Sequence, residues 1–540
     1  MATDPPIDPA HERRHWVRLC TACNNHCCFC LDRQTLDGRL RPRDQLDAEL
    51  QAGRDAGATR LILSGGEPTL HPELPALIRQ ARRLGYRWVQ IITNGRRLAY
   101  PAFFQTLLDA GLDEVTFSIH GSSSRVHDTM VGVPGAFEQT FAGLRRALAA
   151  RLVVSVDVVL TRRNLADAPT LVRRTLAAGV REYDILWLTP FGAAAEHLHR
   201  PRELFLGPAD APAVHRILEL ARRGGAVVWT NRMPLSYLEG FEALAQDPAK
   251  LEDELRGRRR ELEPLIRRGR PLPCRDRRRC PRCPFGDFCD LLHRTVAVAR
   301  GERRAGFVRW DPADETQNAT LRRLPRPSSI WLRTDRPPAA WRQASRAAAL
   351  GARRLRLEAP TAVLAAGLAE LPSHAVLLLQ PVAAFHTWPK PLRHSSHELV
   401  VPLTARLARL DPAPLRTRPG RLVVAAPTAP QGAADGWPFS DGRDPATRRW
   451  LRTAHAVEGL PACLAAGRPT RPRPEPFDLR WLGPEGLVDP WAVLHDFVAE
   501  AHRTLSLRCP TCGARRGCTG IPWAMARDVG LAVLRPLPRR

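Results

Sequence analysis

The chain has 540 residues, of which 44% are hydrophobic and 25% are charged, a composition close to that of globular proteins and unlike that of disordered or collagen-like chains. Its length predicts two to four domains. The formal net charge of +26 keeps nucleic-acid binding open as a function. However, Lys250 and Lys390 are the only lysines, and arginines are spread over the whole chain, as expected of a compositional bias.

The sequence predicts neither a membrane span nor a secretory signal. The most apolar stretch, residues 363–379, is interrupted by Glu370, Pro372 and His374, so it lacks the roughly 18 uninterrupted apolar residues of a transmembrane helix. Residues 1–14 are polar and contain no apolar signal core. We therefore expect a cytoplasmic protein without a membrane partner.

Strand and helix patterns alternate through the first part of the chain. Apolar runs predict six strands, at residues 16–19, 60–63, 88–92, 114–119, 153–160 and 183–188. Amphipathic runs predict helices between them, at residues 73–84, 101–110, 137–149 and 166–178. This alternation predicts an α/β fold with right-handed βαβ units and a parallel sheet. Six near-continuous apolar strands predict a barrel or a partial barrel, whose chemistry lies beyond the carboxyl ends of the strands.

The 13 cysteines fall into three groups and one single residue. The first group lies within eleven residues near the N-terminus: Cys20, Cys23, Cys27, Cys28 and Cys30. The second group lies near the middle: Cys274, Cys280, Cys283 and Cys289. The third lies near the C-terminus, with Cys463 as the single residue: Cys509, Cys512 and Cys518. In a chain without an export signal, such groups indicate metal or iron–sulfur ligands rather than disulfides.

Distinctive polar loops follow four of the predicted strands. In chain order they are residues 23–30 (CNNHCCFC), 64–69 (SGGEPT), 93–95 (TNG) and 118–121 (SIHG). All four therefore lie at the end of the sheet where the chemistry of such a fold is expected.

These loops resemble those of the radical S-adenosylmethionine (radical SAM) superfamily. Its hallmark is Cys-x3-Cys-x2-Cys with an aromatic residue before the last cysteine, after the first strand of a partial (β/α)6 TIM-type barrel. Cys23, Cys27 and Cys30 have this spacing, Phe29 is the aromatic residue, and residues 65–68 read Gly-Gly-Glu-Pro, as in the family. A zinc site at the three cysteines is the alternative.

The resemblance covers roughly residues 10–230 and implies a catalytic [4Fe–4S] cluster. Three thiolates hold three irons and leave the fourth iron open to bind S-adenosylmethionine. In the family, a reduced cluster cleaves this cofactor to methionine and a 5′-deoxyadenosyl radical, which abstracts a hydrogen from the substrate. The surplus cysteines, Cys20 and Cys28, are predicted to be packing residues.

The resemblance also implies contacts to S-adenosylmethionine from five loop residues: Gly65, Gly66, Glu67, Asn94 and Ser118. The glycines would let the backbone approach the methionine part, and the glutamate would accept a hydrogen bond from its ammonium group. The alternatives are an ordinary turn with Pro68 at a helix start, a generic turn at Asn94 and a helix cap at Ser118. His120 stands where the family frequently has aspartate. His120 and His127 are otherwise loop histidines.

The second cysteine group lies in an arginine-rich stretch, residues 256–282. Four cysteines can close a metal site, either around zinc or as an auxiliary iron–sulfur cluster. In placement and loose spacing, the segment 231–300 is similar to the auxiliary-cluster regions (SPASM and twitch) that follow many radical SAM barrels. Packing of the four cysteines is the remaining alternative.

Residues 325–540 are predicted to form a C-terminal α/β domain, with apolar stretches at 375–379 and 421–426. Cys509, Cys512 and Cys518 form three close thiols there, and Cys463 is a candidate fourth ligand. Their spacing suits a second auxiliary cluster and equally resembles half of a zinc ribbon.

The resemblance implies a radical SAM enzyme supplied with electrons by a protein such as flavodoxin or ferredoxin. A peptide or protein is the leading substrate prediction, because auxiliary clusters in the family often serve such substrates. RNA modification is the alternative within enzymes, and a non-catalytic zinc- and nucleic-acid-binding protein is the alternative outside them. The residue that acts on the substrate is not predicted.

Overall fold

The computed structural model describes residues 13–246, 251, 254–255, 258–311, 314–323, 327, 329–333, 354–368, 371, 374–379, 388–404, 408–426 and 444–538. The chain forms two compact units. The first comprises Met1–Tyr237, Leu244–Gln246 and Arg277–Pro284, and the second comprises Leu238–Ala243, Asp247–Asp276 and Phe285–Arg540. The predicted segment 231–300 is thus divided between the units. The polar start of the chain (residues 1–12), Glu370 and Pro372 lie outside the described residues.

The first unit is built on a parallel sheet whose strands are paired in chain order. The strands are β1 (Arg14–Arg18), β2 (Arg60–Ser64), β3 (Trp88–Thr93), β4 (Glu114–Ser118), β5 (Val153–Leu160), β6 (Glu182–Trp187) and β7 (Val227–Asn231). In the pairing order of the described strands, β1 and β7 are the two ends of the sheet and do not pair with each other. The fold is therefore a partial parallel barrel, as predicted.

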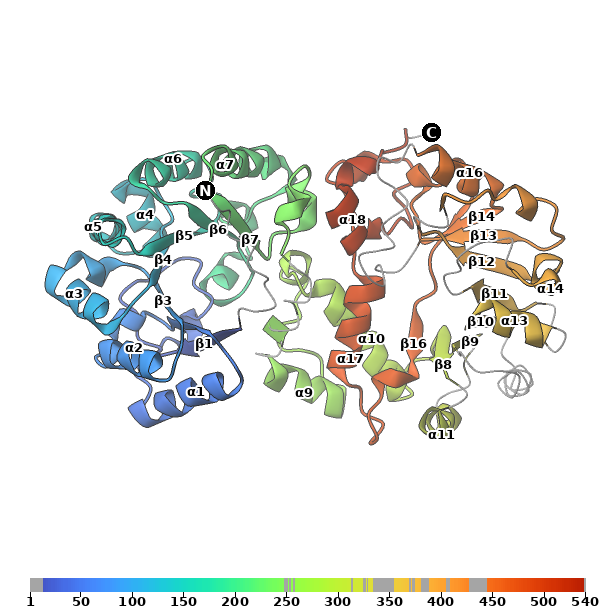
Figure 1. Ribbon diagram of the computed structural model, residues 1–540, viewed down its shortest axis with the longest axis horizontal. Helices are drawn as coiled ribbons and strands as arrows, with labels where there is room; N and C mark the ends of the chain where they lie inside the picture. The colour runs from blue at the N-terminus through green and yellow to red at the C-terminus, as the bar shows by residue number, and fades with distance from the viewer. Residues whose placement is uncertain are drawn as a thin grey trace. The chain divides into compact units, whose positions relative to one another are not determined.

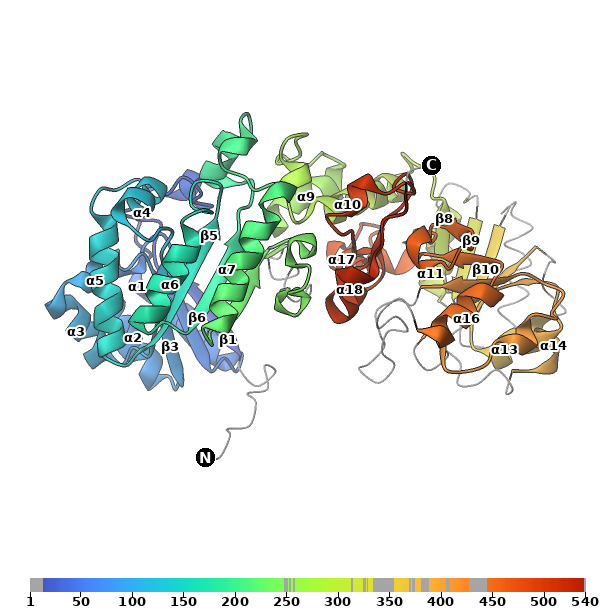
Figure 2. The same cartoon turned by 90° about the horizontal axis from the view of Figure 1, so that it is seen from above.

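Helices cover the outer face of this sheet (Figures 1 and 2). They are α1 (Arg43–Asp55), α2 (Leu74–Arg83), α3 (Pro101–Ala110), α4 (Ser124–Val131), α5 (Ala136–Ala149), α6 (Ala168–Ala178) and α7 (Ala211–Arg223). The six predicted strands and the four predicted helices are present, with ends shifted by a few residues. Strand β7 and helices α1, α4 and α7 were not predicted.

The two faces of the sheet differ in polarity. Leu61, Val89 and Phe117, which belong to the face covered by helices, are fully buried. On the inner face, Arg60 donates to the Glu114 carboxylate at 2.8 Å, and polar side chains on the following strands continue this row of hydrogen bonds. The strands are therefore apolar on the side that the helices cover, and their inner face carries polar groups. The near-continuous apolar runs of the sequence had predicted apolar side chains on both sides.

The second unit contains a second parallel sheet, which follows the α/β prediction for residues 325–540. Its strands are β8 (Phe307–Trp310), β9 (Ser329–Arg333), β10 (Arg354–Ala359), β11 (Val376–Leu379), β12 (Glu398–Pro402), β13 (Leu422–Ala425), β14 (Ala456–Glu458), β15 (Thr470–Arg471) and β16 (Pro476–Asp478). They are paired in chain order from β8 to β15, and β16 pairs with the free edge of β8. The helices α11 (Glu315–Arg323), α13 (Thr361–Gly367), α14 (Lys390–Arg393) and α16 (Pro445–Thr453) lie between these strands in the sequence.

This second sheet is closed into a barrel. Strands β15 and β16 are the two ends of the pairing order, yet they are joined by residues 472–475 alone. Such a link reaches at most about 18 Å, whereas nine flat strands would span about 38 Å. The Arg356 guanidinium of β10 also reaches the Glu458 carboxylate of β14 at 2.7 Å, across three intervening strands. Residues 470–478 therefore act as one interrupted strand that pairs with β14 at its start and with β8 at its end.

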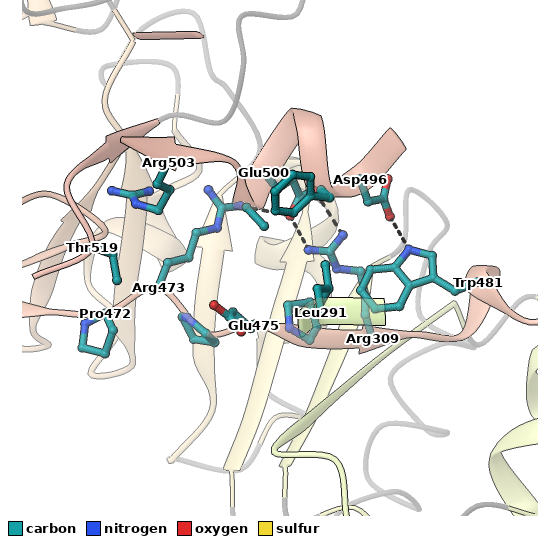
Figure 3. Close-up of a pocket in the computed structure, with 14 residues that line it drawn as sticks. Leu291, Arg309, Pro472, Arg473, Glu475, Trp481, Asp496, Glu500, Arg503 and Thr519 are labelled. Carbon is teal, nitrogen blue, oxygen red and sulfur yellow. Dashed lines mark hydrogen bonds and ion pairs between the residues drawn. The ribbon is translucent and has the colours of Figure 1, made fainter. Parts of the chain in front are cut away.

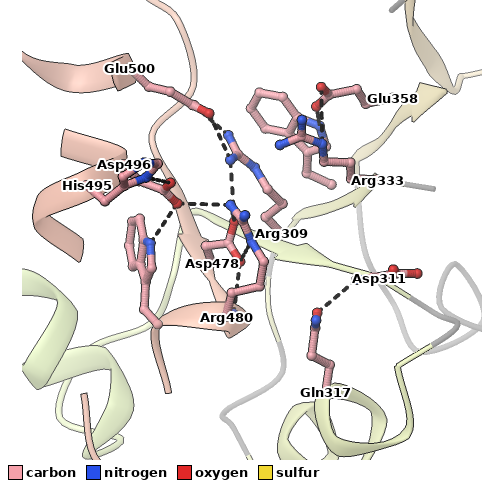
Figure 4. A network of polar contacts seen from close by, with 12 residues as sticks. Arg309, Asp311, Gln317, Arg333, Glu358, Asp478, Arg480, His495, Asp496 and Glu500 are labelled. Atoms are coloured by element: carbon pink, nitrogen blue, oxygen red, sulfur yellow. Dashed lines mark hydrogen bonds and ion pairs between the residues drawn. The ribbon is translucent and has the colours of Figure 1, made fainter. Parts of the chain in front are cut away.

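The barrel interior carries charges around one aromatic ring. Trp331 is fully buried, with the guanidinium groups of Arg309 and Arg356 at 4.6 and 4.4 Å from its ring centroid. Arg309 is bound by the carboxylates of Asp478 and Glu500 (Figure 4). Buried charges of this kind are stable when each is paired.

Short elements complete the second unit. Helices α9 (Arg259–Arg268) and α10 (Gly286–Ala299) precede the barrel, and α17 (Pro490–Asp496), the two-stranded sheet of β17 (Arg503–Thr504) and β18 (Ile521–Pro522), and α18 (Trp523–Val529) follow it. A π-helical turn, Phe497–Ala501, extends α17. Within the part of the chain that the structure describes, none of the helices has the length and apolar composition needed to cross a bilayer.

Candidate active site

The first cysteine loop follows β1 and is fixed by backbone hydrogen bonds to the end of α4. The His26 N–H donates to the Val131 carbonyl at 2.8 Å, and the Cys28 N–H donates to the Met130 carbonyl at 3.1 Å. The loop therefore has a defined path at the carboxyl end of the sheet, where it was predicted to lie.

The structure brings Cys23, Cys27 and Cys30 together. Burial raises the pKa of the Cys23 thiol to about 11, and the nearby charge of Cys30 acts in the same direction. Burial likewise raises the pKa of Cys27, as do the charges of the Cys23 and Cys30 thiolates. A positively charged metal group would stabilise the thiolates of such half-buried cysteines.

The two surplus cysteines of this loop are engaged elsewhere. The Cys20 thiol lies within hydrogen-bonding distance of the carbonyl oxygens of Ala22 (3.4 Å) and Glu67 (3.3 Å). Cys28 packs with Phe29 against an apolar cluster that includes Leu188. These contacts are those of packing residues, as predicted, and they leave three thiols of this loop for a metal group.

The Gly-Gly-Glu-Pro loop docks directly on the cysteine loop. The Gly66 N–H donates to the Cys20 carbonyl and the Glu67 N–H donates to the Ala22 carbonyl, both at 2.8 Å. A Cβ atom at Gly66 would lie 2.3 Å from the Ala22 carbonyl oxygen, which no real contact allows. Gly65 has a φ of +139°, and its Cβ would also strike the Cys20 backbone. Both glycines are therefore required for contact between the loops, besides the cofactor approach predicted for them.

Replacing Gly66 with alanine is expected to separate the two loops, because the clash is with backbone atoms. Overpacking of this kind costs about 1–3 kcal/mol. The expected result is faster amide hydrogen exchange in residues 19–30 and loss of iron from the purified protein. Gly207→Ala is the matched control, since its Cβ would meet no atom closer than 3.8 Å. Unchanged exchange in Gly66→Ala would contradict the close approach.

Glu67 joins the loops that follow β2 and β3. Its buried carboxylate accepts hydrogen bonds from the Thr69 N–H (3.0 Å), the Thr93 hydroxyl (2.6 Å) and the Asn94 N–H (2.8 Å). Burial raises the pKa of Glu67, while these donors oppose the rise. The side chain is thus already bound by protein donors, and its contact with a cofactor ammonium group stays a prediction.

The loop after β3 also reaches the cysteine loop. The Asn94 side-chain amide donates to the Asn24 side chain at 2.7 Å, and the Arg96 guanidinium donates to the Asn24 carbonyl at 2.6 Å and to the Asn25 side chain at 3.1 Å. Arg96 and the two asparagines were not predicted as site residues. Their signal is their position, since Asn24 and Asn25 stand between two of the predicted ligands and Arg96 directly follows the Thr-Asn-Gly loop.

The region after β4 contains two buried histidine rings, His120 and His127. Ser118 is the last residue of β4, and the cap of the next helix is Ser123, so the alternative of Ser118 as a helix cap is wrong. The His120 ring accepts a hydrogen bond from the Val159 N–H at 3.3 Å, and the His127 ring accepts one from the His120 N–H at 3.2 Å. Burial lowers the pKa of His120, and it lowers that of His127 to about 4. Both rings are buried and hydrogen-bonded, but His127 lies in α4 rather than in a loop as predicted.

The second cysteine group is divided between the two units. Cys280 and Cys283 enclose a 3-10 turn of the first unit, in which the Cys283 N–H donates to the Cys280 carbonyl at 3.1 Å. Cys274 and Cys289 belong to the second unit. A common site for these four residues stays a prediction.

The third group lies wholly in the second unit, and Cys463 lies beside it. Burial raises the pKa of the Cys463 thiol, and the charges of the other three thiolates raise it further. Those three residues are Cys509, Cys512 and Cys518. Cys463, although distant in the sequence, therefore lies near the third cysteine group, for which it was predicted as a fourth ligand.

Across the described residues, no three Cys, His, Asp or Glu side chains are gathered tightly enough to hold a metal ion. Around one zinc ion with bonds of about 2.3 Å, tetrahedral thiolates lie about 3.8 Å apart. A [4Fe–4S] cluster holds each thiolate on a different iron and so keeps the sulfurs further apart. A [4Fe–4S] cluster at Cys23, Cys27 and Cys30, and the alternative of zinc there, both stay predictions.

Comparison with known proteins agrees with this site. The sequence model of the radical SAM superfamily matches residues 17–174. A probable GTP 3′,8-cyclase of Saccharolobus solfataricus is 32% identical over 178 residues, covering 33% of this chain and 57% of that protein. An AdoMet-dependent heme synthase of Methanosarcina barkeri is 30% identical over 181 residues, covering 33% of this chain and 51% of that protein. The chain thus spans about half the length of these curated relatives.

Among solved structures, Streptococcus suis SuiB bound to the precursor peptide SuiA is similar, with 14% identity and a TM-score of 0.35 over 44% of this chain and 52% of that one. The family match, the motif spacing and the parallel partial barrel agree on the same segment. Residues 17–174 therefore match the radical SAM superfamily, and the matched segment lies within the partial parallel barrel.

Proposed function

We propose that the protein is a radical SAM enzyme in which Cys23, Cys27 and Cys30 hold a catalytic [4Fe–4S] cluster. The observation that carries this proposal is the convergence of these three thiols in a loop whose other two thiols are bound elsewhere. When bound, such a cluster supplies the electron that breaks the S–C5′ bond of S-adenosylmethionine, giving methionine and the 5′-deoxyadenosyl radical, which takes a hydrogen from the substrate.

The chain's own residues would bind and orient the cofactor. Gly65 and Gly66 keep the loop after β2 against the cysteine loop that would hold the cluster. Asn94 and Ser118 come from the ends of β3 and β4, on the same side of the sheet. We assign these residues to cofactor binding, with Glu67 bracing the loops. An external reductant such as flavodoxin or ferredoxin would supply the electron.

Two substrate classes are supported by different observations. A peptide or protein substrate is supported by the two later cysteine groups, which both read Cys-Pro-x-Cys-x5-Cys and both begin with a 3-10 turn. A small organic substrate is supported by the relatives, whose names describe a GTP cyclase and a heme synthase. RNA is supported by net charge alone.

We also propose that Cys463, Cys509, Cys512 and Cys518 hold a second metal group. The four thiols sense one another's charge within the second unit, and four thiolates can close a metal site. The shared Cys-Pro-x-Cys turn supports the same kind of group at Cys274, Cys280, Cys283 and Cys289.

Metal analysis and cofactor cleavage test the proposal together. Protein prepared without oxygen is expected to bind about four irons at the first loop and, when reduced, to release 5′-deoxyadenosine from S-adenosylmethionine. Cys463→Ser is expected to lower the metal content without removing this cleavage. Stoichiometric zinc with no iron, and no 5′-deoxyadenosine, would instead identify a non-catalytic binding protein.

A further inference from the structure

The second unit contains a cavity beside the interrupted strand that closes its barrel (Figure 3). Its volume is about 90 Å³. A cavity needs about 10–15 Å³ to hold one water molecule, so this one has room for a ligand of several heavy atoms. Three arginines line it together with apolar side chains, among them Trp481 and Phe497.

The acidic residues of this cavity are bound to other partners. Glu500 accepts two hydrogen bonds from Arg309, at 3.1 and 2.7 Å. Burial alone would raise the pKa of Glu500, but the Arg309 charge and its hydrogen bonds lower it to about 2. Asp496 accepts from the Trp481 indole at 2.8 Å and from Arg480 at 2.9 Å. The third acid of the lining pairs with a cation outside the cavity. These carboxylates are therefore already neutralised.

Two arginines of the lining, Arg473 and Arg503, lack such a partner of their own. The nearest carboxylate oxygen to Arg473 belongs to Glu500, at 3.7 Å, and that group is already held by Arg309. Among the residues that the structure describes, Arg503 forms no ion pair. It donates to the carbonyl oxygens at positions 459 and 520, at 2.5 and 2.6 Å, and its buried Nε has no hydrogen-bond partner there.

The two guanidinium groups also lie near each other. Burial lowers the pKa of Arg503 to about 10, and the Arg473 charge acts in the same direction. The Arg473 side chain is 21% exposed, so it is only partly in contact with water. The charges of Cys518 and Glu475 act on Arg503, but neither arginine has a carboxylate to itself, and two neighbouring, partly buried cations of this kind are costly. An anion between them would remove this cost through charge-assisted hydrogen bonds.

We propose that this cavity binds a small organic anion, whose carboxylate or phosphate lies between Arg473 and Arg503 and whose apolar part lies against Trp481 and Phe497. The site belongs to the second barrel and does not depend on the radical SAM chemistry proposed above. Cys518 also lies within electrostatic range of Arg503, so the competing explanation is that Arg503 balances the thiolates of the third cysteine group.

Calorimetry on the full chain tests the proposal with three probes. Benzoate is expected to bind, benzamide, which has the same shape without the charge, is expected not to bind, and inorganic phosphate is expected to compete with benzoate. Arg473→Met should weaken benzoate binding by about ten-fold or more, the usual effect of losing a charge-assisted hydrogen bond. Arg300→Met is the matched control. It removes an arginine of the same unit that pairs with Glu302 and does not line the cavity, and it should leave the affinity within about two-fold.

The outcomes separate the explanations. Failure of benzoate and phosphate to bind at millimolar concentration would overturn the proposal, as would equal binding of benzoate and benzamide. Unchanged benzoate affinity in Arg473→Met would assign the arginines to the thiolates instead. If Arg473→Met does not fold, hydrogen exchange of the wild-type chain decides, because benzoate should slow exchange in residues 473–481 and benzamide should not.

Discussion

Replacing Cys27 with alanine is expected to reduce 5′-deoxyadenosine formation below about 1% of the wild-type rate. Loss of one of three thiolates leaves the cluster without a stable set of ligands, and no cofactor cleavage occurs without the cluster. The charges of both the Cys23 and the Cys30 thiolates raise the pKa of Cys27. The measurement is anaerobic chromatography of the products after reduction, with iron analysis of the same sample.

Cys28→Ala is the matched control for this variant. Cys28 is the next residue in the same loop, but its side chain packs with Phe29 in an apolar cluster. It should retain iron and cofactor cleavage, apart from a modest loss of stability. Cleavage that persists in Cys27→Ala, or that disappears equally in Cys28→Ala, would contradict the ligand assignment.

Removing the carboxylate of Glu458 is expected to destabilise the second barrel by about 3–5 kcal/mol, the usual cost of leaving a buried charge without its partner. Glu458 is 1% exposed and binds Arg356 through both oxygens, at 2.7 and 3.1 Å. It also binds Arg471 at 3.0 Å. Glu458→Gln would therefore leave two guanidinium groups facing an uncharged amide. Hydrogen exchange of β10 and β14 measures the effect within this unit.

Two further variants make this test specific. Glu302→Gln removes an exposed ion pair with Arg300 and should change stability by less than about 1 kcal/mol. The double variant Arg356→Leu/Glu458→Leu should recover much of the loss, because apolar replacement of a buried pair is often neutral or better. A Glu458→Gln protein as stable as the wild type would show that the pair does not hold the barrel together.

The sequence predicted the first barrel well because its signals are local. The predicted helix 101–110 coincides with α3, and the predicted strand 153–160 coincides with β5, since each has its own periodicity and clear boundary residues. Strand β7 is short, and of its three apolar side chains Val228 is buried while Val227 and Trp229 are exposed, so it lacks the long buried run of the other strands.

The second barrel could not be derived in the same way. Its closing strand is split by the sequence PRPE at residues 472–475, and prolines argue against a central strand. The charged interior around Arg356 and Glu458 contradicts the apolar pattern expected of a buried sheet. Both features become stable through partners distant in the sequence, which no local pattern reveals.

The candidate site could likewise be predicted only where its signals are local in the sequence. The cysteine spacing predicted Cys23, Cys27 and Cys30 as the ligands of the first loop, because short motifs fix local chemistry, and this assignment stays a prediction. The roles of Glu67 and Arg96 depend on contacts between loops from different strands, so the sequence could place these residues near the site without giving their partners.

The interrupted strand also sets the order in which the protein can mature on the ribosome. Asp478, which ends that strand, follows Arg309 of β8 by 169 positions, so about 10–30 s of synthesis separate the two at ordinary rates. During that interval, the edge of β8 that later pairs with β16 has no partner. The unclosed sheet therefore presents unpaired backbone groups to other nascent chains. Newly made protein should therefore expose this edge until residues 470–478 have emerged from the ribosome.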